Sequence, residues 1–208
     1  MDGCLFCKSE IINQGILDET QNFYHRANMV GAVAPGHSMI IPKTHFGCYA
    51  EIPSSLDEEY LDFKNIVEER VSKAFSKPIM VEQGIHAQSV SHAHTHFLPS
   101  ISEWYNFQNG TSFMDMLPDG IKVTKCSSLE DLRKIFREEG QYVSIEEQGV
   151  LYACHTKEYA SLLRPCREFP CKLTGLTSLL YWEKMSEEDK NKNKDYIAET
   201  FKKLKQGV

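Results

Sequence analysis

The sequence lacks the features that mark membrane-spanning and secreted proteins. No apolar run in its 208 residues approaches the roughly 20 needed to cross a bilayer, and its start, MDGCLFCKSE, has no basic segment followed by an apolar one. Its formal net charge of -6 also lacks the positive excess of a surface that binds a nucleic-acid backbone. We therefore expect neither a membrane protein nor a binder of extended nucleic acid, although a local site for a small anion fits this charge.

The cysteines lack the regular spacing of a disulfide framework. There are seven, an odd number, and they lie at positions 4, 7, 48, 126, 154, 166 and 171. An irregular and odd set of this kind favours reduced thiols over paired ones. We therefore expect a cytoplasmic protein.

Histidine is nearly missing from the second half of the chain. Of the eight histidines, seven lie before position 97, and four of these fall between positions 86 and 96. The composition, 41% apolar and 25% charged, is that of a globular protein with a core, and the length suits one domain with a large extension. We divide the chain into a domain over residues 1–100, which should hold the chemistry, and an extension over 101–208 packed on it, whose role the sequence does not indicate.

The spacing of apolar residues and the positions of turn residues in the first half predict an antiparallel β meander covered by one long helix. Apolar residues at spacings of three and four, from Leu56 to Phe75, indicate an amphipathic helix that is capped by Ser55 and stopped by Pro78. Short strands are predicted on both sides of it, over 21–25, 28–34, 37–41, 79–82 and 89–98. This pattern belongs to the α+β class.

The second half predicts an α/β extension. Ser127 and Glu130 have the spacing of a capping box for a helix that ends at Gly140, and a hairpin is expected about Gln148-Gly149. A last helix starts near Ser186 and ends in lysines, an order of charges that suits the helix dipole. No internal repeat is visible in the sequence.

Three histidines at alternate positions form the most informative motif. On a strand, side chains alternate, so His92, His94 and His96 should project from one face. Because neutral imidazole is available near pH 7 and has two distinct nitrogens, such a row can supply a nucleophile, proton donors and a metal ligand. A solvated polar strand face with incidental histidines is the alternative.

The run from His92 to His96 resembles the His-φ-His-φ-His signature of the histidine-triad (HIT) superfamily of nucleotide hydrolases and transferases. Upstream, Pro35-Gly36-His37 resembles the family's Pro-Gly-His strand, and Ile41-Pro42-Lys43-Thr44-His45 resembles its Ile-Pro-Lys-x-His segment. Glu82-Gln83-Gly84 stands where a Glu-His-Gly-like element often precedes the triad. The resemblance covers about residues 4 to 99, with the blocks in the family's order.

The resemblance implies catalytic roles for four residues. His94 matches the nucleophile that attacks the α-phosphorus of a nucleotide derivative and forms a covalent nucleotidyl-histidine intermediate. Ser89 and His96 match positions that hold phosphate oxygens or assist the leaving group, and His37 matches a fourth histidine at the border of the site.

Three residues are candidates for contact with the substrate. Many family members grip the ribose with an Asp before the Pro-Gly-His strand, but Asn28 is the nearest equivalent here. Gln88, beside Ser89, is a second candidate. Arg164 could reach a second phosphate or a leaving group, or it could be a surface or packing residue.

A Cys-x2-Cys pair near the start indicates a metal site. Cys4 and Cys7 need two further ligands to complete a tetrahedral zinc site, and the resemblance implies that these are His45 and His92. A closed Cys2His2 set leaves no position for water, so the zinc would be structural and would support His94. The alternative is a reduced pair without metal.

The sequence thus predicts a hydrolase of nucleotide phosphoramidates or dinucleoside polyphosphates, or a nucleotidyltransferase, with a small nucleotide substrate. The resemblance also implies a homodimer. One alternative is a metallohydrolase in which the three histidines hold an open catalytic metal, although no carboxylate partner motif accompanies them. Another is a nucleotide-binding module without turnover.

Overall fold

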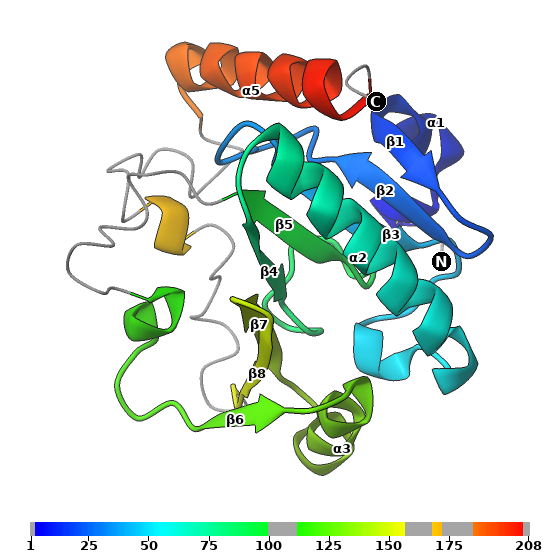
Figure 1. Cartoon of the computed structure of the whole chain (residues 1–208), viewed down its shortest axis with the longest axis vertical. Coiled ribbons are helices and arrows are strands. Elements are labelled where there is room, and N and C mark those ends of the chain that lie inside the picture. Colours follow the sequence, from blue (N-terminus) through cyan, green and yellow to red (C-terminus); the bar gives the residue numbers. More distant parts are fainter. Residues whose placement is uncertain (1–2, 100–111, 157–167, 172–184, 206–208) are drawn as a thin grey trace.

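In the computed structural model, one eight-stranded antiparallel sheet runs through both halves of the chain, in the order β1-β2-β3-β5-β4-β7-β8-β6 (Figure 1). The structure describes residues 3–99, 112–156, 168–171 and 185–205. The α+β class predicted from the sequence is confirmed.

The first half supplies five strands and one long helix. After the short helix α1 (Ser9–Ile12), the elements are β1 (Ile16–Glu19), β2 (Phe23–Ala27), β3 (Ser38–Pro42), α2 (Asp57–Ala74), β4 (Pro78–Glu82) and β5 (Thr95–Pro99). Along β5 the side chains alternate, so Phe97 packs into the cluster under α2, whereas Leu98 packs into the cluster on the other face. The sheet is therefore apolar on both faces at its centre.

Helix α2 covers one face of the sheet as its period predicts. Tyr60, Phe63, Val67 and Val71, at spacings of three and four, are buried against it. The predicted cap is wrong, because Ser55 lies inside a 3-10 turn and Leu56 stands at the cap position without a side-chain hydrogen bond.

In its described residues the second half adds three strands and two long helices, which are β6 (Val123–Cys126), α3 (Leu129–Glu139), β7 (Val143–Glu147), β8 (Val150–Cys154) and α5 (Glu187–Lys205). It also has short helical segments over residues 113–116 and 168–171. The hairpin about Gln148-Gly149 and the end of α3 at Gly140 are confirmed, and Gly140 has a left-handed backbone conformation. The capping box lies one residue later than predicted, on Ser128 and Asp131.

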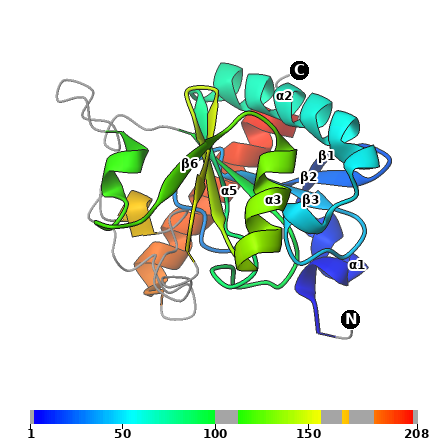
Figure 2. The ribbon, with the colours of Figure 1, turned by 90° about the horizontal axis from the view of Figure 1, so that it is seen from below.

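The second half repeats the topology of the first. The unit β3-α2-β4-β5 places its strands in the order β3-β5-β4, and the unit β6-α3-β7-β8 places its own in the order β6-β8-β7. The β4·β5 and β7·β8 ladders also share a register, since each pairs the first residue of one strand with the last of the other, Pro78 with Pro99 and Val143 with Cys154. The two units meet in the antiparallel β4·β7 ladder, which leaves β6 at one end of the sheet and β1 at the other (Figure 2).

Two predicted strands are corrected by the structure. Residues 28–34 are not a strand but part of an irregular loop between β2 and β3, in which Gly31 and Gly36 have positive φ angles. The strand predicted over 89–98 is formed only from Thr95 onward, because the backbone N–H groups of His92 and Ala93 bond to Val90 and Phe46 instead of a neighbouring strand. Only His96 of the three histidines therefore lies on a strand.

Helix α5 lies across the loop that joins β2 and β3 and packs beside α2 and β1 (Figure 1). No helix among the described residues combines the length and the apolar composition needed to cross a membrane. The six cysteines in the described ranges form no disulfide with one another.

Candidate catalytic and metal site

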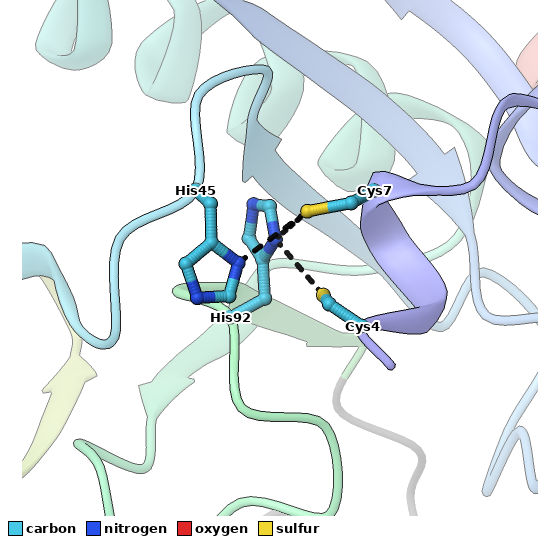
Figure 3. A group of neighbouring side chains, drawn as sticks. All are labelled: Cys4, Cys7, His45 and His92. Carbon is cyan, nitrogen blue, oxygen red and sulfur yellow. Dashed lines mark hydrogen bonds between the residues drawn. The ribbon is translucent and has the colours of Figure 1, made fainter. Parts of the chain in front are cut away.

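Two cysteines and two histidines from three parts of the chain point toward one another (Figure 3). Sγ of Cys4 lies 3.4 Å from Nδ1 of His92, and Sγ of Cys7 lies 3.4 Å from Nδ1 of His45 and 3.5 Å from Nδ1 of His92. All four ligand atoms lie within 4.8 Å of one another. Usual zinc–sulfur and zinc–nitrogen bonds at a tetrahedral angle give a sulfur–nitrogen distance of about 3.6 Å. The cluster thus has the chemistry and dimensions of a metal site.

The protonation of the cluster also suits a cation. Nε2 of His92 donates to the carbonyl oxygen of Pro42 at 2.8 Å, so in the neutral ring Nδ1 carries the lone pair that faces the cysteines. Burial lowers the pKa of His92, which keeps the ring neutral. Burial and the neighbouring Cys4 raise the pKa of the Cys7 thiol, and a bound cation would oppose this by stabilising both thiolates.

His94 is buried next to the cluster and has a fixed tautomer. Its Nδ1 donates to the carbonyl oxygen of His92 at 2.6 Å, so in the neutral ring Nε2 carries the lone pair. The ring of Phe6, from the Cys-x2-Cys segment, meets it edge-on with centroids 5.3 Å apart, and the guanidinium of Arg26 lies 5.8 Å from the centroid of Phe6. The segment that carries the two cysteines thus also packs against His94, which is 4% exposed.

His96 is held by a chain of hydrogen bonds from the β2–β3 loop. The backbone N–H of Val33 donates to Nδ1 of His37 at 3.2 Å, which leaves the proton of the neutral ring on Nε2. Nε2 of His37 then donates to Nδ1 of His96 at 2.9 Å, so His96 carries its proton on Nε2. The ring centroids of His94 and His96 lie 4.8 Å apart. A ring with a nucleophilic nitrogen thus stands beside a ring that can donate a proton.

The other predicted site residues have different surroundings. The Asn28 amide nitrogen lies 3.2 Å from Nδ1 and 3.3 Å from Nε2 of His37, so Asn28 is buried against the ring of a site histidine. Gln88 donates to the carbonyl oxygen of Gly47 at 2.6 Å. Ser89 is exposed and lines a shallow cavity of about 430 Å³ beside Cys4 and His45. Arg164 lies outside the described residues.

The structure does not bring the three histidines together on one ion. His92 turns its two nitrogens toward the cysteines and Pro42, and in the described part of the chain the group with metal-ligand geometry does not contain His94 or His96. Phe6 and the N–H of Val33 were missed by the sequence reasoning. Phe6 lies between the two cysteines and could have been noticed there, whereas nothing in the sequence marks a backbone donor.

Comparison with known proteins agrees with the motifs. Residues 16–102 match the HIT domain. None of the curated proteins matches the chain.

Solved structures with similarity to this chain come from bacteria, archaea and yeast. A HIT family hydrolase from Clostridium thermocellum is 25% identical over 58% of this chain and 98% of that chain, with a TM-score of 0.40. A zinc-bound histidine triad family protein from Mycobacterium smegmatis is 23% identical over 48% of this chain and 76% of that chain, with a TM-score of 0.38. Yeast Ap4A phosphorylase in complex with AMP is 13% identical over 65% of this chain and 57% of that chain, with a TM-score of 0.42.

Proposed function

We propose that this chain, which carries a HIT domain over residues 16–102, cleaves nucleotide phosphoramidates or dinucleoside polyphosphates at the α-phosphorus, or transfers their nucleotidyl group to an acceptor. The observation that carries the proposal is the pair of fixed tautomers. His94 has its lone pair on Nε2, and His96 beside it has its proton on Nε2. The catalytic domain is residues 1–100, with residues 101–208 as its extension.

The reaction proceeds in two displacements. Nε2 of His94 attacks the α-phosphorus, a P–N bond forms, and the bond between phosphorus and the leaving group breaks. The leaving group takes a proton from a nearby donor. Water or another acceptor then attacks the phosphorus, gives its proton back to that donor, breaks the P–N bond and regenerates His94. Imidazole suits this role because the phosphoramidate it forms is readily hydrolysed.

His96 supplies the donor. Its Nε2–H donates to a phosphoryl oxygen or to the leaving group as negative charge develops there, and His37 keeps it in that tautomer. Ser89, at the exposed end of the loop, is the second proposed donor, through its hydroxyl, to a phosphate oxygen. The buried position of Asn28 against His37 favours a role in orienting that ring, and Gln88 and Arg164 stay predictions.

Cys4, Cys7, His45 and His92 would hold a structural zinc ion. With four protein ligands the ion has no place for water, so its chemistry is to fix geometry. It would hold the Phe6 segment against His94 and would hold His92, whose carbonyl oxygen orients His94.

The decisive experiment follows AMP release from adenosine 5′-phosphoramidate and diadenosine polyphosphates in the presence of chelator. We expect release by the wild-type protein and no release by His94→Ala. His86→Ala is the matched control, because His86 lies in the same loop but is exposed, and it should retain turnover. Intact-mass measurement of a quenched reaction should show one added nucleotidyl group on the wild-type chain and none on His94→Ala.

The same experiment distinguishes the alternatives. Turnover that chelator removes and added metal restores would favour an open metal site. Binding of nucleotide without turnover of any conjugate would favour a binding module. Either result overturns the covalent mechanism.

Two further expectations accompany the proposal. Homodimerisation, implied by the family, can be measured by light scattering; since β7 occupies the edge of β4, a dimer would have to use another surface. A cytoplasmic location is expected from the odd number and irregular spacing of the cysteines and can be tested by fractionation.

A further inference from the structure

The loop between β2 and β3, residues 28–37, carries His37 but has no ladder partner along most of its length. It contains two glycines with positive φ, Gly31 at 70° and Gly36 at 85°. Its buried backbone groups must therefore find hydrogen bonds outside the sheet, since an unpaired buried N–H or C=O group is costly.

Helix α5 supplies these hydrogen bonds from the far end of the chain. The side chain of Asn193 accepts from the N–H of Gly31 at 3.4 Å and donates to the carbonyl oxygen of Ala32 at 3.1 Å. The hydroxyl of Thr200 accepts from the N–H of Gly36 at 2.7 Å. Both side chains are buried, at 6% and 1% exposure.

The spacing of the two residues along α5 lets both side chains face the loop. Asn193 and Thr200 are seven residues apart, which is about two turns, so they share one face of α5. Thr200 also donates its hydroxyl proton to the carbonyl oxygen of Tyr196 at 2.7 Å. Its oxygen is thereby oriented as an acceptor for Gly36, which a purely apolar helix face would not provide.

The loop segment that α5 holds is the one that sets the state of the site histidines. Val33, whose N–H fixes the tautomer of His37, follows directly after Ala32, and Gly36 directly precedes His37. The ring of His37 in turn donates to His96. An uninterrupted series of contacts therefore runs from α5 through the loop backbone to the proton on His96.

We propose that Asn193 and Thr200 are positioning residues for the His37–His96 pair, and that α5 is the part of the extension on which catalysis depends. This inference rests on the proposed function for its kinetic consequence. Without the two side chains the loop backbone shifts, Val33 no longer selects the tautomer of His37, and His96 loses its fixed proton.

The first test compares three variants of α5 at a temperature below all their unfolding transitions. Thr200→Val removes the acceptor with little change in shape and should lower kcat about tenfold, the usual effect of losing an orienting partner, with a smaller effect on KM. Thr200→Ser keeps the hydroxyl and should restore kcat. Leu204→Ala is the matched control, since Leu204 is buried on α5 in the cluster with α2 and does not belong to the loop contacts.

The control separates positioning from simple stabilisation. Leu204→Ala should lower the melting temperature at least as much as Thr200→Val but leave kcat within about twofold. If kcat falls in proportion to lost stability in both variants, the inference is overturned. Should Thr200→Val fail to fold, Asn193→Ala takes its place, with the same expected loss of kcat.

A spectroscopic measurement keeps the inference testable even if no nucleotide conjugate is turned over. In ¹⁵N spectra of the histidine rings, wild-type His37 should be protonated on Nε2, and Thr200→Val should show a mixture of tautomers. Absence of turnover with this tautomer change would contradict the proposed function alone. An unchanged His37 signal in Thr200→Val would contradict the role of α5.

Discussion

Glu82, the last residue of β4, gives the sharpest prediction about stability. Its side chain is 2% exposed and lines a cavity of about 570 Å³ between α2 and α3. Oε1 accepts from the N–H of Gly84 at 3.1 Å, and the hydroxyl of Tyr142 and the N–H of Tyr49 also lie against the carboxylate and oppose the rise in its pKa. Burial is the main cause that raises its pKa from 4.5 to about 7.

The sign of the pH dependence follows from where the proton sits. Between pH 4.5 and about 7 the folded protein holds a proton on Glu82 that the unfolded chain has released, so stability falls as pH rises through this window. A pKa rise from 4.5 to about 7 corresponds to about 3 kcal/mol, at 1.36 kcal/mol for each pKa unit. Glu82→Gln has no charge at any pH and should avoid this loss.

Urea unfolding at pH 4.5 and pH 8 measures the effect. We expect Glu82→Gln to be more stable than the wild type by up to about 3 kcal/mol at pH 8 and to differ little from it at pH 4.5. Glu188→Gln, which removes an exposed carboxylate on α5, should leave the pH dependence unchanged. An equal difference between Glu82→Gln and wild type at both pH values would refute the reasoning.

Three further predictions concern the two halves and the metal cluster. Lys64→Met leaves Glu146, its half-buried partner at 2.6 Å, without a counter-charge and should cost about 1–3 kcal/mol in urea unfolding. Glu146→Gln in the same chain should recover a part of this loss. Gly84→Ala brings a Cβ into the backbone carbonyl oxygen of Tyr142 in the second half, so it should lower the melting temperature far more than Gly140→Ala, which has a similar φ but open space. Cys4→Ser should bind less than the roughly one zinc per chain expected of the wild type in a colorimetric release assay, and equal zinc content would contradict the ligand set.

Much of the fold could be predicted because its signals are local. The spacing of Tyr60, Phe63, Val67 and Val71 marks α2 without reference to the rest of the chain. The dipeptide Gln148-Gly149 likewise predicts a hairpin turn. In the structure both of its residues adopt the positive φ angles of such a turn. The Cys-x2-Cys pair and the histidine row were visible for the same reason, as short motifs.

The parts that could not be predicted depend on distant partners. His92 leaves the strand pattern because its ring turns to cysteines more than 80 residues away and the next N–H bonds to Phe46. The loop at residues 28–37 has strand-forming residues, but its backbone is satisfied by Asn193 and Thr200, more than 160 residues later. The topological repeat is equally hidden, because the two units share strand register without visible likeness in sequence.

The ladder between β4 and β7 joins two units of like topology within one covalent chain. Their mutual concentration is therefore set by the connecting segment and not by the amount of protein, so dilution cannot separate them. In the repeated unit, the two residues Gln148-Gly149 connect the hairpin strands where the first unit has the twelve residues 83–94 that include His92 and His94. The repeated architecture thus carries these histidines in one unit alone among the described residues, so under the proposed mechanism each molecule should saturate with one nucleotidyl group.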